Sequence, residues 1–102
     1  MATSPLRLEI HPRAVAEARA ARRWYARRSP AIADQFMAEL DQAMTRLTAA
    51  PHHWPAYLYE TKVYRLRRFP YLLVYSLSAA AVQVIAVAHG KRRPGYWRRR
   101  LP

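Results

Sequence analysis

The stretch YLLVYSLSAAAVQVIAVA, Tyr71 to Ala88, contains the most apolar strand candidates of the chain. Two runs within it, Tyr71–Leu77 and Val82–Ala88, are rich in β-branched and large apolar residues at successive positions. A strand that is apolar on both faces is buried on both faces, so we expect two central strands of one sheet. Ser78 to Ala81 is short enough to connect them as a hairpin.

Two further strands are expected on either side of this pair in the sequence. Lys62 to Phe69 alternates between apolar and basic residues, which places Arg65 and Arg67 on one strand face about 7 Å apart. Pro70 interrupts this strand, because proline cannot donate to a sheet ladder. Leu6 to Ile10 also alternates and predicts a short, half-buried strand near the N-terminus.

Two helices are predicted between the first strand and the other three. Pro12 to about Arg28 has helical spacing and begins with a proline, which is well tolerated at the first helical position. Ser29 and Pro30 repeat that start signal, and the second helix should run to about Ala49, before Pro51. One face of the second helix is apolar: Ile32, Phe36, Leu40, Met44 and Leu47.

This order of elements defines the expected fold class. A strand, two closely joined helices and three more strands predict an α+β protein. An antiparallel helical hairpin should pack on one face of a mainly antiparallel sheet, which the three C-terminal strands complete. The chain length of 102 residues suits a single domain, residues 1–102.

Charge is distributed very unevenly along the chain. The formal net charge is +12, and residues 61–102 contain ten lysines and arginines but no acidic residue. Such a surface attracts polyanions or acidic proteins, and arginine binds carboxylates and phosphates bidentately. A GC-rich coding sequence would produce the same arginine bias. The absence of cysteine, of a signal-peptide core and of a long apolar run leads us to expect a cytoplasmic protein without membrane association.

Two segments carry a family resemblance: Tyr64-Arg-Leu-Arg-Arg-Phe-Pro-Tyr-Leu-Leu-Val-Tyr75 and Val84-Ile-Ala-Val-Ala-His-Gly-Lys-Arg-Arg-Pro-Gly-Tyr-Trp97. Together with the two upstream helices they resemble the RelE/ParE superfamily of bacterial toxins from type II toxin–antitoxin systems. The Phe-Pro-Tyr stretch and the His-x-x-Arg-x-Pro-x-x-Trp-like element resemble the ParE-like branch more closely.

The resemblance implies a toxin that is neutralised by a cognate acidic antitoxin. ParE-like members poison DNA gyrase and need no catalytic residues of their own, which is the function we expect here. RelE-like members instead cut mRNA on the ribosome, and this remains the alternative. A plain nucleic-acid-binding domain is a third reading, weakened because no helix shows a recognisable DNA-reading arrangement.

Candidate functional residues follow from these readings. A ribonuclease needs an acid, a base and cations for the phosphate, and the candidates for that role are His89, Tyr96, Arg65 and Arg67. The simpler interpretation is that the protein only binds, with a target-binding set in the basic segment after His89: Arg92, Arg93, Tyr96, Trp97 and Arg98. Antitoxin binding is expected at Arg65, Arg67 and Arg68.

Aromatic and histidine residues outside those sets are expected to be structural or inert. Trp24 and Tyr25 should pack between helix and sheet, whereas Trp97, within the target-binding set, is expected to be exposed among the arginines. The adjacent His52 and His53 have no third ligand nearby in the sequence, so we expect no metal site and no cofactor.

Overall fold

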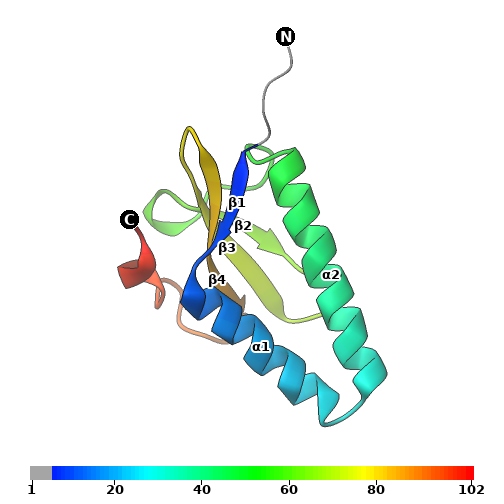
Figure 1. The fold of residues 1–102 in the computed structure, drawn as a ribbon. Coiled ribbons are helices and arrows are strands. Elements are labelled where there is room, and N and C mark those ends of the chain that lie inside the picture. The colour runs from blue at the N-terminus through cyan, green and yellow to red at the C-terminus, as the bar shows by residue number, and fades with distance from the viewer. Residues whose placement is uncertain (1–5) are drawn as a thin grey trace.

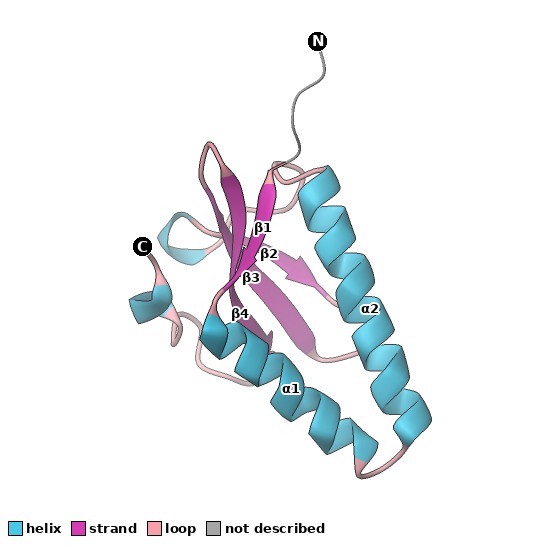
Figure 2. Cartoon of the chain, in the orientation of Figure 1, coloured by secondary structure: helices cyan, strands magenta, loops and turns pink. Residues whose placement is uncertain are grey.

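The computed structural model describes residues 6–102, and residues 1–5 of the expected domain lie outside it. The regular elements are β1 (Arg7–Ile10), α1 (Pro12–Ala26), α2 (Pro30–Ala49), β2 (Lys62–Arg65), β3 (Tyr71–Leu77) and β4 (Ala81–His89), with short 3-10 helices at Leu58–Glu60 and Arg98–Arg100. Both long helices cover the same face of the sheet (Figures 1 and 2). The predicted α+β class and helical hairpin are confirmed.

The strand order across the sheet is β1-β4-β3-β2, so the two most apolar strands occupy its centre, as predicted. β2, β3 and β4 pair antiparallel, whereas β1 pairs parallel with β4. A β-bulge interrupts the centre of the sheet. Tyr75 pairs with Val84 and Val74 pairs with Ala86, which leaves Ile85 without a partner in β3.

The helical hairpin is fixed by the caps that the sequence indicates. The Ser29 hydroxyl accepts a hydrogen bond from the backbone N–H of Ile32 at 3.3 Å, and Pro30 begins α2. Phe36 and Leu47 are buried against the sheet, which confirms the apolar face of α2. Ile32 departs from it, because it lies in the first turn, at the tip of the hairpin, and is 40% exposed.

The opposite face of the sheet is covered by the C-terminal segment, residues 90–102. Trp97 is only 1% exposed and packs on residues of the central strands, including Val74 and Ile85. The expectation that Trp97 is exposed is therefore wrong. A sheet whose central strands are apolar on both faces needs a second cover, and the indole provides it.

β2 is shorter than predicted and ends at Arg65. The backbone N–H groups of Arg67 and Arg68 donate to the Glu39 carboxylate of α2, at 2.7 Å and 3.3 Å, in a bend rather than a strand. The expectation that Arg65 and Arg67 share one strand face is therefore wrong. A carboxylate on the neighbouring helix replaces a strand partner for these N–H groups.

Candidate partner-binding site

The C-terminal segment is attached to α1 by one glutamate. The Glu17 carboxylate receives both guanidinium nitrogens of Arg100, with Nη1–Oε1 at 2.8 Å and Nη2–Oε2 at 3.1 Å. The Tyr96 hydroxyl donates to Oε2, and the backbone N–H of Val87 donates to Oε1 at 3.1 Å. We call this set the Glu17 network. Because every donor meets one carboxylate, the network joins α1, β4 and the C-terminal segment.

The Glu17 network lies beside the second half of β4, which is not paired with β1. β1 reaches only as far as Val84 on β4, and the bulge at Ile85 follows directly. Beyond that point the Val87 N–H donates to Glu17, and the Ile85 carbonyl accepts from Arg100 at 3.2 Å. Two charged side chains thus satisfy backbone groups that a longer β1 would have paired.

A second contact holds the same segment against the loop before β2. Gly95 has φ 84°, a conformation that favours glycine, and a Cβ there would approach Tyr59 Cε2 to 3.1 Å. The Arg98 guanidinium lies 4.4 Å from the centre of the Tyr59 ring, which also contacts Trp97 edge-on. The C-terminal segment is therefore fixed at both of its sides.

A groove of about 430 Å³ lies between α1 and the ends of β3 and β4. Its walls are mainly aromatic and include Trp24, Tyr25, Tyr71, His89 and Tyr96. The Tyr71 and His89 rings meet edge to face at 5.0 Å. Burial raises the pKa of Tyr71, and the Glu17 charge raises it further.

Tyr96 carries the strongest pKa perturbation among these groups. Burial raises the pKa of its hydroxyl, the hydrogen bond to Glu17 and the charge of Glu17 raise it further, and Arg100 and Arg92 oppose the change. The hydroxyl is therefore a hydrogen-bond donor committed to Glu17. It is poorly placed to give a proton to a substrate.

The four ribonuclease candidates are not brought together. His89 and Tyr96 line the groove on the helix side of the sheet. Arg65 is paired with Leu72 of β3, and Leu72 packs with Trp97 on the face of the sheet away from the helices. Paired residues of neighbouring strands point to the same face, so the Arg65 side chain also projects from the face away from the helices. Arg65 and Arg67 both line another hollow, beside Arg46 and Trp54, which contains neither His89 nor Tyr96.

The residues expected to bind partners are distributed over two surfaces. Arg92, Arg93 and Arg98 are exposed on the C-terminal segment, and Arg92 stacks over Tyr96 at 3.9 Å. Trp97 belongs to the expected target-binding set, but its side chain is buried against the sheet and offers no exposed contact. The arginines expected to bind the antitoxin, Arg65, Arg67 and Arg68, are exposed around β2 and the bend that follows it.

The sequence did not predict that four residues belong to this site: Glu17, Arg100, Trp24 and Arg28. Trp24 was expected to pack against the sheet but is 48% exposed, with the Arg28 guanidinium 3.4 Å from its ring centre. Tyr25 does pack as expected, against Phe36 and Phe69. One signal was present in the sequence, since Glu17 is the sole acidic residue of α1.

The fold has a counterpart among solved structures. A chain described as "Chromosomal ParDE TA system from P. aeruginosa" superposes with a TM-score of 0.74, covering 82% of this chain and 95% of that chain at 14% identity. Residues 8–94 match the model of the family described as ParE toxin of type II toxin–antitoxin system, parDE. The chain therefore belongs to the ParE toxin family, as its sequence resemblance indicated. No curated protein matches it.

Membership of this family defines the protein as the toxin of a type II toxin–antitoxin system, whose partner is an antitoxin. The family match ends at Pro94, so Tyr96 and Arg100 of the Glu17 network lie beyond it. Within residues 6–102, no helix is long and apolar enough to cross a membrane, and no cluster of side chains could hold a metal ion.

Proposed function

We propose that this toxin inhibits bacterial growth in the cytoplasm by binding and poisoning DNA gyrase, and that an acidic antitoxin neutralises it. The target would meet the exposed arginines of the C-terminal segment, Arg92, Arg93 and Arg98, together with the edge of Tyr96. The Glu17 network and the buried Trp97 keep this segment in one conformation. A rigid surface loses less entropy on binding than a flexible one.

The observation that carries this proposal is the separation of the ribonuclease candidates. Acid–base catalysis requires the acid, the base and the phosphate-binding cations within hydrogen-bond reach of one substrate. Here His89 lies on the helix side of the sheet and Arg65 on the other, and Tyr96, which lines the groove but also packs with the cluster around Trp97, already donates to Glu17. These features favour a binding function over RelE-like cleavage of mRNA.

The antitoxin is expected to bind near β2. Arg65, Arg67 and Arg68 are exposed there, and β2 is an edge strand. Neither of the two ion pairs among the described residues involves these arginines. An acidic segment would supply the missing carboxylates.

The proposal is tested by inducible expression followed by two separate assays, one for gyrase-dependent DNA breaks and one for mRNA cleavage. We expect DNA breaks without codon-positioned cuts, and we expect His89→Ala to remain toxic. Loss of toxicity in a folded His89→Ala protein, together with cleavage of ribosome-bound transcripts by the wild type, would instead establish the RelE-like alternative.

A further inference from the structure

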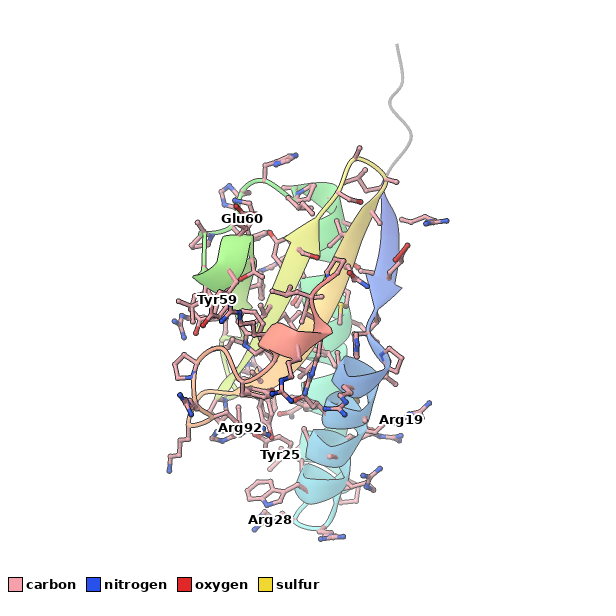
Figure 3. All side chains as sticks on the ribbon, turned by 90° about the vertical axis from the view of Figure 1, so that its left-hand side faces the viewer. Arg19, Tyr25, Arg28, Tyr59, Glu60 and Arg92 are labelled. Atoms are coloured by element: carbon pink, nitrogen blue, oxygen red, sulfur yellow. The ribbon has the colours of Figure 1, made fainter. Side chains whose placement is uncertain are left out.

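The groove beside α1 is flanked by two structures of the same kind. On one side the Arg28 guanidinium stacks on Trp24 at 3.4 Å, and on the other the Arg92 guanidinium stacks on Tyr96 at 3.9 Å. Figure 3 shows Arg92, Tyr25 and Arg28 following one another along one side of the molecule. The two pairs come from distant parts of the chain, the end of α1 and the segment after β4.

Between the two pairs the groove is apolar and aromatic. Trp24 meets Tyr25 edge to face at 5.1 Å, Tyr25 meets Tyr71 at 6.5 Å, and Tyr71 meets His89 at 5.0 Å. Ala20, Ala21, Pro70 and Val87 are the aliphatic residues of the lining. The volume of about 430 Å³ lies within the ~300–1,000 Å³ typical of ligand pockets, and it suits a few side chains rather than a whole helix.

The groove has no unpaired negative charge among its lining residues. Glu17 is its sole acidic lining residue, and that carboxylate already receives Arg100, Tyr96 and the Val87 N–H. Neither Arg28 nor Arg92 forms an ion pair within the described part of the chain. Two exposed arginines without an acidic partner among the described residues therefore lie at the two ends of the aromatic groove.

We propose that this groove is a docking site for the target protein, and that it receives an acidic segment with an aromatic or long aliphatic side chain between carboxylates. The apolar side chain would lie on Tyr25 and Tyr71, and the carboxylates would meet Arg28 and Arg92. Aromatic residues and arginines of this kind dominate the energetics of protein interfaces. This inference rests on the proposed function and extends the target-binding surface from the C-terminal segment onto α1.

The decisive variants lie near the C-terminal end of α1, Trp24 in the helix and Arg28 in the turn that follows it, outside the segment that the proposed function already uses. Trp24→Ala and Arg28→Glu alter exposed side chains and leave the helix–sheet core unchanged. Arg19→Glu is the matched control, since Arg19 is an exposed arginine of α1 that points away from Tyr25 in Figure 3. Arg92→Glu tests whether the C-terminal segment contributes to target binding. Thermal unfolding of each purified variant verifies that it is folded.

Affinity for purified DNA gyrase and for the cognate antitoxin is then measured for every variant. Trp24→Ala and Arg28→Glu should weaken gyrase binding on the order of tenfold or more and relieve growth inhibition in proportion. Arg19→Glu should leave gyrase binding near the wild-type value. Antitoxin binding should be retained by all of these variants.

Three other outcomes overturn the inference. If Arg92→Glu loses gyrase binding while Trp24→Ala and Arg28→Glu keep it, the proposed function stands and the groove is no part of the interface. If Trp24→Ala and Arg28→Glu lose antitoxin binding but bind gyrase normally, the groove belongs to the antitoxin. If the wild-type protein does not bind gyrase, the proposed function fails, and this docking site fails with it.

Discussion

Arg100 and Glu17 form a bidentate ion pair across 83 positions of sequence, with Nη1–Oε1 at 2.8 Å and Nη2–Oε2 at 3.1 Å. The two side chains are 10% and 17% exposed, so the pair is largely removed from water. Removing one member of a buried pair leaves the other charge without compensation, which is strongly destabilising. The attachment of the C-terminal segment to α1 therefore depends on a single carboxylate.

Glu17→Gln should release the C-terminal segment without unfolding the helix–sheet core. The amide loses the charge that holds Arg100 and one of the acceptor oxygens that hold Tyr96 and Val87. Hydrogen exchange followed by mass spectrometry should show faster exchange over residues 92–100 and little change in β3.

Glu39→Gln is the matched control for that experiment. Glu39 also lies on a helix and accepts backbone N–H groups, but those of Arg67 and Arg68. Its replacement should speed exchange near Arg67 and leave residues 92–100 unchanged. Equal exchange over residues 92–100 in the wild type and in folded Glu17→Gln would show that Glu17 does not hold the segment.

Trp97→Ala should destabilise the protein about as much as Phe36→Ala, although the two residues lie on opposite faces of the sheet. Both side chains are almost fully buried, at 1% and 0% exposure. Truncating a buried Trp or Phe to alanine typically costs about 3–5 kcal/mol of unfolding free energy. Urea unfolding measures both values. A loss below about 1 kcal/mol for Trp97→Ala would contradict a packed second face.

Tyr75 should make stability fall at alkaline pH. Burial raises the pKa of its hydroxyl from 10.0 to about 12, and the hydroxyl donates to the Pro51 carbonyl at 2.7 Å. Below about pH 10 the residue is neutral in both the folded and the unfolded chain. As the pH rises through the interval between the two pKa values, the unfolded chain loses its proton first. Stability then falls by about 1.4 kcal/mol per pH unit.

Tyr75→Phe lacks this ionisation, so comparing it with the wild type isolates the effect from that of the other tyrosines. The stability advantage of the wild type over Tyr75→Phe should shrink by on the order of 2 kcal/mol between about pH 9 and about pH 11.5. Tyr59→Phe is the control, because Tyr59 is 47% exposed. An unchanged difference across that range would mean that the Tyr75 hydroxyl ionises normally in the folded state.

The elements that the sequence predicted correctly are those with strong local signals. Tyr71–Leu77 and β4 are apolar at nearly every position, which identifies central strands without knowledge of their neighbours. The start of α2 is encoded by two adjacent residues, Ser29 and Pro30. Periodicity and capping are local properties, so one sequence is sufficient to read them.

The errors arise where a distant residue decides the local structure. Arg67 has strand-like neighbours, but the Glu39 carboxylate takes its N–H. Trp97 stands in a basic run without apolar periodicity, and its burial follows from the second face of the sheet. Glu17 has its partner 83 residues away, so no pattern within α1 shows that it is paired.

The last prediction separates toxicity from neutralisation. Charge reversal of Arg65, Arg67 and Arg68 to glutamate should weaken antitoxin binding strongly, because these exposed arginines around β2 would then repel acidic side chains. Toxicity should persist, since the C-terminal segment and the groove contain none of the three residues. Cells that co-express the antitoxin should consequently be rescued from the wild-type toxin but not from the variant.

Replacing three arginines of α1 by glutamate is the control, because it changes the net charge by the same amount. Arg19, Arg22 and Arg23 are exposed on α1 around a different hollow, which none of Arg65, Arg67 and Arg68 lines. Their reversal should leave the antitoxin able to rescue growth. Antitoxin affinity measured at low and high salt adds a second readout. The wild-type complex should lose affinity as salt screens the arginines, and the variant with Arg65, Arg67 and Arg68 reversed should lose less. Equal rescue of both triple variants would place antitoxin recognition away from β2.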